Sequence, residues 1–284
     1  MSRLVRDRVL IGSLRCAALV AGAIVVLIVV FLVLEALPAL RNVGLGSFFT
    51  DETWRPSEQL YNLMPMLWGS LLATVGAVLV ATPLGILSAI FCRFYAPPAV
   101  ASVYRRLIEL LAGIPSVIYG LWGLVVLVPL IGSIRAPGTS LLAGILILAI
   151  MITPIIAMLA DSAIGAVPQP FLNGAAGLGL SRAATIWHIV LPNARSGLIM
   201  SVILATGRAL GETMAVLMVC GNAVATPGSV FDSVRVLTAN IALEMAYAMG
   251  DHRSALFVSG LLLTALIMAL ILAAELVSRR TGHE

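Results

Sequence analysis

The fold is indicated most directly by one stretch, Phe171–Val216, which reads FLNGAAGLGLSRAATIWHIVLPNARSGLIMSVILATGRALGETMAV. A polar segment rich in small residues lies between two apolar runs, and the second run contains Arg208 and Glu212. The sequence upstream is apolar enough to cross a membrane, so we expect the small-residue segment at the bilayer surface, within reach of a soluble partner. The two charges then fall where hydrocarbon is expected. This combination is typical of a transport path that is driven from outside the membrane.

The composition is that of a membrane protein. Of 284 residues, 61% are hydrophobic and 11% are charged, and the mean hydropathy is +1.09. All 17 basic residues are arginine. Since a P-loop needs a lysine to hold nucleotide phosphates, we expect nucleotide chemistry to belong to another subunit. The pI near 9.3 does not indicate a nucleic-acid partner, because the arginines are scattered rather than clustered on one face.

The apolar runs predict an all-α polytopic membrane protein with six transmembrane helices, each crossing needing about 20 residues. The expected spans are residues 16–34, 65–91, 107–130, 139–160, 196–221 and 252–277. A signal peptide is the competing interpretation of the first run, but the run ends in Glu35 and Pro38 without a small-residue cleavage site. We therefore divide the chain into residues 1–64, with the first helix and a periplasmic loop, and residues 65–284, a core of five helices.

The arginines set the expected orientation, because cytoplasmic loops of membrane proteins carry an excess of basic residues. Segments predicted to be cytoplasmic hold eleven arginines: Arg3, Arg6, Arg8, Arg15, Arg93, Arg105, Arg106, Arg182, Arg195, Arg279 and Arg280. Segments predicted to be periplasmic hold five: Arg41, Arg55, Arg135, Arg235 and Arg253. Both termini and the loop at residues 161–195 are therefore predicted to face the cytoplasm.

Arg208 and Glu212 are four residues apart, so on a continuous helix they share one face. The guanidinium of Arg208 offers a planar fork of donors that suits a tetrahedral oxyanion, and Glu212 would hold this arginine while the site is empty. The alternative is a neutral pair that braces a helix interface. Gly207 and Gly211 form a small-xxx-small pair that would allow another helix to approach closely.

Other candidate residues indicate packing rather than chemistry. Gly113 and Pro115, in the segment GIPSVIYG (Gly113–Gly120), are predicted to serve helix packing or kinking in the third span. The three cysteines lie in or beside apolar runs and form no CxxC pair. His188 has no companions for a metal site, since His252 is predicted on the other side of the membrane. We predict neither a metal site nor a catalytic triad.

The polar segment resembles the cytoplasmic "EAA" loop of ABC importer permeases, whose pattern is E-A-A-x3-G-x9-I-x-L-P. Gly179, Ile189, Leu191 and Pro192 match that pattern, whereas Asn173, Gly174 and Ala175 stand where the family has Glu-Ala-Ala. The resemblance implies a short coupling helix that docks in a groove of an ATPase. Gly174, Ala175, Ala176 and Gly177 would allow close approach, Gly179 would make a turn, and Pro192 would stop a helix before the next span.

GRALGETMAV (Gly207–Val216) and GIPSVIYG together resemble the PstC-type permease of phosphate-specific ABC importers. The resemblance implies the type I importer permease fold and a place in the bacterial inner membrane. It also implies three kinds of partner: a PstA-like second permease, two ATPase subunits that bind ATP and Mg²⁺, and a periplasmic phosphate-binding protein. Such a chain would be a transport subunit, not an enzyme, and would carry no cofactor of its own.

Two alternatives stay open. The same machine could import another oxyanion, such as molybdate or sulfate, since an arginine fork suits all three anions. A secondary transporter is a different class, which inverted repeats and broken half-helices would support. The sequence has no clear internal repeat, and a cytoplasmic coupling loop has no use in that scheme.

Overall fold

The computed structural model describes residues 3–281, with side chains for residues 10–272, and this part is almost entirely helical. The long helices are α1 (Arg3–Asn42), α3 (Met64–Ile90), α4 (Pro98–Ala112), α7 (Leu141–Gly165), α10 (Leu191–Leu210) and α13 (Gly250–Thr281). Between them lie α2 (Ser47–Thr50), α5 (Ser116–Trp122), α6 (Val128–Gly132), α8 (Gln169–Gly177), α9 (Arg182–Thr185), α11 (Met214–Val219) and α12 (Leu237–Glu244). Three segments are π-helical: η2 (Phe91–Tyr95), η3 (Gly123–Leu127) and η4 (Ile186–Val190). A small antiparallel hairpin pairs β1 (Trp54–Arg55) with β2 (Leu60–Tyr61), linked by the 3₁₀ turn η1 (Pro56–Glu58).

Within residues 3–281, five helical segments are long and apolar enough to cross a membrane: Leu10–Asn42, Met64–Tyr95, Leu141–Gly165, Arg182–Leu210 and Gly250–Leu272. A bent pair, Pro98–Ala112 with Ser116–Gly132, makes a sixth crossing if it is counted as one span. The prediction of an all-α polytopic membrane protein is therefore confirmed. The predicted number of six spans is reached when the bent pair is counted as the third span.

The third predicted span, residues 107–130, is not one straight helix, since the axes of its two halves meet at 92°. Pro115 has no N–H and disfavours helical backbone at the residue before it, so α4 and α5 cannot be continuous. The Tyr119 hydroxyl donates a hydrogen bond to the Leu111 carbonyl across the break (2.7 Å). A Cβ at Gly113 would meet only main-chain oxygens, at 3.4 Å and beyond. Within this chain Gly113 and Pro115 thus form a break rather than a close helix contact.

The fifth predicted span, residues 196–221, begins and ends earlier than expected. One helix runs over Arg182–Leu210 and includes η4. The prediction that Pro192 stops a helix is wrong, because Pro192 lies in the first turn of α10, directly after η4. The wider π-helical turn changes the hydrogen-bond register there, so the missing N–H of proline does not break the helix. The helix ends before Gly211, a poor helix former, and α11 follows.

The centre of the fold is the contact between α3 and α7. Alanines of α3 (Ala73, Ala77 and Ala81) are buried against large aliphatic side chains of α7 such as Ile147 and Ile152. Gly76 and Gly85 of α3 fit closely against α7, and a Cβ at Gly85 would lie 2.7 Å from Cγ2 of Ile156. Small residues therefore bring the two helices together, as is usual where lipid supplies no hydrophobic drive for helix association.

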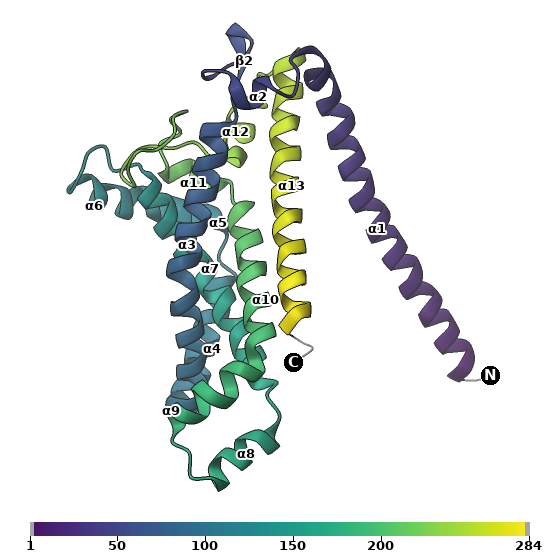
Figure 1. Cartoon of the computed structure of the whole chain (residues 1–284), viewed down its shortest axis with the longest axis vertical. Helices are drawn as coiled ribbons and strands as arrows, with labels where there is room; N and C mark the ends of the chain where they lie inside the picture. The colour runs from purple at the N-terminus through teal and green to yellow at the C-terminus, as the bar shows by residue number, and fades with distance from the viewer. Residues whose placement is uncertain (1–2, 282–284) are drawn as a thin grey trace.

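The helix α1 diverges from the other helices, and only its second half reaches α13 (Figure 1). There Phe31 packs edge-to-face on Phe257, with ring centroids 5.7 Å apart, and Glu35 forms an ion pair with Arg253 at 3.4 Å. The most apolar 18-residue window of α1 has none of its residues buried inside the chain.

The two ends of the molecule differ in structure. Figure 1 shows that α1 begins and α13 ends toward the end that carries α8, which we call the α8 end (residues 169–177). The opposite end, which we call the hairpin end (residues 47–61), contains α2, β1 and β2. Two of the three stretches predicted as periplasmic, residues 39–63 and 222–251, are folded. In the first, α2 and the hairpin bury Phe48, Trp54 and Tyr61, and in the second, α12 is buried over Leu237–Asn240.

Candidate functional site

Arg208 lies in the last turn of α10, directly before the break in the fifth span. Its side chain is exposed, and among residues 10–272 it has no hydrogen-bond or ion-pair partner. An arginine with free donors in the last turn of a membrane span, directly before a helix break, has the character of an anion site.

Glu212 does not pair with Arg208 in this structure, contrary to the expectation that the two share a helical face. Because α10 ends at Leu210, Glu212 belongs to the turn before α11. Its Oε1 accepts a hydrogen bond from the N–H of Ala215 (3.3 Å), and its main-chain carbonyl accepts one from the Thr238 hydroxyl (2.7 Å). The carboxylate is buried and satisfies an N–H at the start of α11, where a negative charge is favourable.

The predicted close approach at Gly207 and Gly211 does not occur within this chain. No atom lies within 4 Å of a Cβ built at Gly207, and at Gly211 only main-chain oxygens of α10 are near. This face of α10 is open beside Arg208, and a contact of the two glycines with another subunit stays a prediction. The close glycine contact nearby is at Gly120, where a Cβ would lie 2.9 Å from Cα of Ala215. This contact packs α5 against α11.

The predicted coupling segment forms a separate short helix, α8, at one end of the molecule (Figure 1). Gly179 follows it with φ +70°, so the turn predicted from this glycine is confirmed. The N–H of Gly179 bonds to the carbonyl of Ala176, and the N–H of Leu180 bonds to that of Ala175. This pair of bonds is a Schellman motif, which ends a helix with a residue in the left-handed region.

The surface of α8 consists of small exposed residues. Asn173, Gly174, Ala176 and Gly177 are exposed, whereas Ala175 is buried against the rest of the chain. Among the described residues, no atom lies within 4 Å of a Cβ built at Gly174 or Gly177. Leu191, further along, is half-buried. The helix thus offers close access to another protein.

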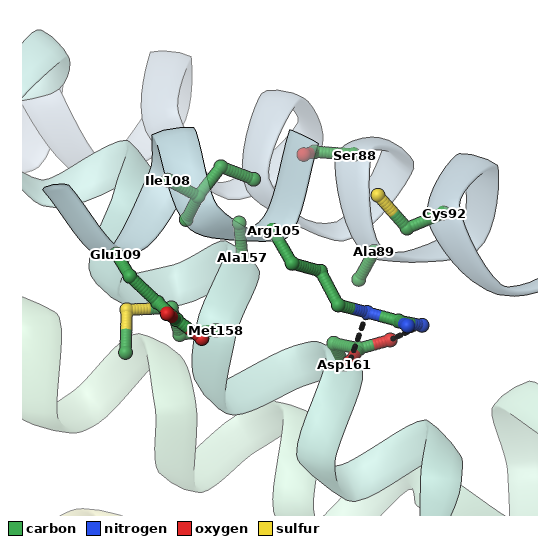
Figure 2. Close-up of a pocket in the computed structure, with 9 residues that line it drawn as sticks. All are labelled: Ser88, Ala89, Cys92, Arg105, Ile108, Glu109, Ala157, Met158 and Asp161. Atoms are coloured by element: carbon green, nitrogen blue, oxygen red, sulfur yellow. Dashed lines mark hydrogen bonds and ion pairs between the residues drawn. The ribbon is translucent and has the colours of Figure 1, made fainter. Parts of the chain in front are cut away.

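A cluster of charges that the sequence reasoning missed lies near the α8 end. Asp161 of α7 forms ion pairs with Arg93 of η2 (3.4 Å) and Arg105 of α4 (3.1 Å), and we call these three residues the Asp161 cluster. Figure 2 shows Arg105 extended toward Asp161 across a cavity of about 120 Å³. Glu109, one turn further along α4, borders the same cavity on the side of Met158. The signal in the sequence that could have drawn attention to this region is the carboxylate of Glu109, which lies inside the predicted third span.

A second missed cluster lies at the hairpin end. Glu244, at the end of α12, accepts hydrogen bonds from Nε1 of Trp54 (2.8 Å) and from Arg235 (2.6 Å), and it contacts Nε2 of His252 (2.8 Å). We call these four residues the Glu244 cluster. It joins the hairpin, the segment before α12, α12 and α13. Within the part of the chain with described side chains, no group of three or more His, Cys, Asp or Glu residues could hold a metal ion.

The fold and the site define a membrane subunit of an importer. The family of binding-protein-dependent transport system inner membrane components matches residues 81–283, and the chain belongs to that family. It is thus the permease component of an ABC importer, and not the enzyme that hydrolyses ATP.

Two relatives of similar length sharpen this assignment. The chain is 37% identical to a probable ABC transporter permease protein, YqgH, of Bacillus subtilis, over 97% of this chain and 91% of that one. It is 34% identical to the phosphate transport system permease protein PstC of Mesorhizobium japonicum, over 93% of this chain and 88% of that one. Similar matches include PstC of Haemophilus influenzae, at 34% identity.

Solved structures share the fold at low identity. A bacterial alginate ABC transporter matches 99% of both chains with a TM-score of 0.68 and 16% identity. The inward-facing MetNI methionine transporter matches 80% of this chain and 99% of its own, with a TM-score of 0.62 and 20% identity. The predicted type I importer permease fold is confirmed by these neighbours.

Proposed function

We propose that this chain is the permease subunit through which an ABC importer moves inorganic phosphate across the bacterial inner membrane. The observation that carries the proposal is Arg208, an exposed arginine without an ion-pair partner among the described residues, at a helix break inside a span. Relatives of nearly the same length are named as phosphate transport permeases, which supports phosphate as the transported anion.

The chemistry of Arg208 suits this role. A guanidinium keeps its charge at any physiological pH and offers several donors in one plane, which matches the oxygens of a tetrahedral anion. Because Glu212 is hydrogen-bonded to the start of α11, we assign it the task of holding the turn that presents Arg208. Gly207 and Gly211 leave the face beside Arg208 open, and we propose that a PstA-like second permease closes the path there.

We further propose that α8 docks in a groove of an ATPase subunit, with two such subunits supplying ATP hydrolysis with Mg²⁺. The small exposed residues Asn173, Gly174, Ala176 and Gly177 support this, since they allow close approach by another protein. The glutamate of the family's loop is replaced by Asn173, so docking would rely on shape and on neutral hydrogen bonds here.

The orientation follows from the arginine count. We propose that the α8 end and both termini face the cytoplasm, and that the hairpin end faces the periplasm, where a phosphate-binding protein would deliver the anion. Residues 1–64 would then form a unit beside the permease core at residues 65–284. Its first part, α1, is peripheral, whereas residues 47–61 pack on α12 and α13 of the core. The divergence of α1 from the other helices agrees with this division.

The substrate is tested by uptake in cells. Labelled phosphate uptake at micromolar concentration is measured in a strain that lacks other phosphate importers, with and without this chain and its neighbouring transport genes. We expect uptake that depends on this chain and that excess unlabelled phosphate, but not sulfate or molybdate, suppresses. Phosphate uptake that does not depend on this chain, together with labelled sulfate or molybdate uptake that does, would assign the chain to another oxyanion, the second candidate.

The coupling role of α8 is tested with Gly177→Arg. In the part of the chain that the structure describes, nothing lies within 4 Å of a Cβ at Gly177, so the variant should fold. We expect it to lose co-purification of the ATPase or stimulation of ATP hydrolysis. Gly46→Arg at the hairpin end, where a Cβ also meets nothing, is the matched control. Normal coupling in Gly177→Arg would reduce α8 to an ordinary surface helix.

A further inference from the structure

A second binding site is suggested by an apolar groove on the outside of the helix bundle. The groove has a volume of about 390 Å³, and we call it the α3–α9 groove. One wall is the last part of α3 with η2, and the other is α9 with η4; the lining includes Pro83, Ile86, Ile90, Ala183, Ile186 and Leu191. Ligand sites in proteins usually enclose about 300–1,000 Å³, so the groove is large enough for one.

Both walls depart from regular α-helix at the groove. The α3 wall ends in the π-helical η2, and the other wall contains the π-helical η4. Single π-helical turns inside α-helices occur frequently at functional sites. Since both walls belong to membrane spans, Met64–Tyr95 and Arg182–Leu210, the groove opens within the bilayer.

The lining of the groove is apolar except for two aromatic residues with polar atoms, Tyr95 (51% exposed) and Trp187 (69% exposed). We call the part of the groove at these two residues its mouth. Tyrosine and tryptophan in such positions are typical of the membrane interface, where their polar atoms meet the headgroups. The mouth lies toward the α8 end, since α9 follows directly after α8 (Figure 1).

A cation without a carboxylate partner is at this mouth. Arg182 donates a hydrogen bond to the carbonyl of Phe94, next to Tyr95 (3.4 Å). Among the described side chains Arg182 has no acidic partner, whereas Arg93, on the same turn as Phe94, is engaged by Asp161. The mouth therefore combines aromatic side chains with one positive charge that is available for an anion.

We propose that the α3–α9 groove binds one acyl chain of an anionic phospholipid, whose phosphate is held by Arg182 in the leaflet at the α8 end. A flexible chain with an anionic head matches both the apolar interior and the charged mouth. The bound lipid would fix α3 to α9, the segment that follows the coupling helix.

The test uses the full-length permease, purified in mild detergent and mixed with phosphatidylglycerol or with phosphatidylcholine of the same acyl chains. Bound lipid is counted by native mass spectrometry. We expect the wild type to retain phosphatidylglycerol in preference, and Arg182→Gln to lower that retention about fivefold without affecting phosphatidylcholine. Ala183→Phe, which fills the groove, should lower retention of both lipids. Arg106→Gln, an exposed arginine of α4 outside the groove, is the matched control.

A second measurement identifies the occupant in the cell membrane. A photo-crosslinking residue at position 87, on the α3 wall, should label phospholipid. Labelling of a second permease or an ATPase subunit instead would overturn the proposal, as would unchanged phosphatidylglycerol retention in Arg182→Gln.

Discussion

At the hairpin end, Glu244 is held by three donors in a buried site, whereas at the α8 end Asp161 is held by two arginines near the surface. The Glu244 side chain is 9% exposed, while Asp161 is 22% exposed and its arginine partners 36% and 40%. Buried ion pairs are costly to break from one side, whereas exposed pairs contribute about 0–1 kcal/mol. The difference indicates a rigid hairpin end and a looser α8 end. With the orientation and the coupling role proposed above, the rigid end would face the delivered substrate and the looser end would allow the movement of α8.

The largest effect is expected from Glu244→Ala. The change removes the buried carboxylate that accepts from the indole N–H of Trp54 and forms the ion pair with Arg235, so we expect the free energy of unfolding to fall by roughly 3–5 kcal/mol. Arg235 keeps its hydrogen bonds to Asn222 and Asn240. Thermal melting of the purified permease measures it. Glu58→Ala, which breaks the exposed pair with Arg55, is the control and should change little. Equal melting of the two variants would contradict the stabilising role of the buried Glu244 cluster.

A smaller effect on stability is expected from Asp161→Asn. Because its partners are more than a third exposed, we expect a loss of at most about 1 kcal/mol. Asp161 connects α4 and η2 to α7, the helix that leads into α8. We therefore expect a clear loss of uptake per assembled complex with little change in the free energy of unfolding. Parallel measurement of melting and uptake separates the two. A large loss of stability with normal uptake would make the Asp161 cluster a structural brace like the Glu244 cluster.

Local sequence patterns predicted the parts of this fold that depend on nearest neighbours. The span predicted at residues 65–91 is the helix Met64–Ile90, and the turn predicted at Gly179 has the positive φ that favours glycine. Both follow from apolar length and from backbone freedom, which a few adjacent residues determine.

The parts that local patterns could not predict depend on contacts between distant segments. Trp54 and Glu244 are 190 residues apart, and Arg93 and Asp161 are 68 apart, so no spacing rule brings them together. The end of α10 before Gly211 was missed for a related reason. The spacing of Arg208 and Glu212 fits a continuous helix. In the structure α10 ends at Leu210, and hydrogen bonds from Ala215 and Thr238 hold Glu212 in the turn that follows.

The central claim, that Arg208 contacts the transported phosphate, is tested most directly by labelled-phosphate uptake, normalised to assembled complex. Because Arg208 has no ion pair with Glu212 here, replacing it does not orphan a buried carboxylate. Arg208→Lys keeps the charge but loses the planar fork. Losing one charge-assisted hydrogen bond is worth about 1.5–3 kcal/mol, so we predict at least about tenfold slower uptake at limiting phosphate. Arg208→Gln should abolish uptake, and Arg106→Lys should not change it. Wild-type uptake in both Arg208 variants would contradict the account and place the anion path elsewhere.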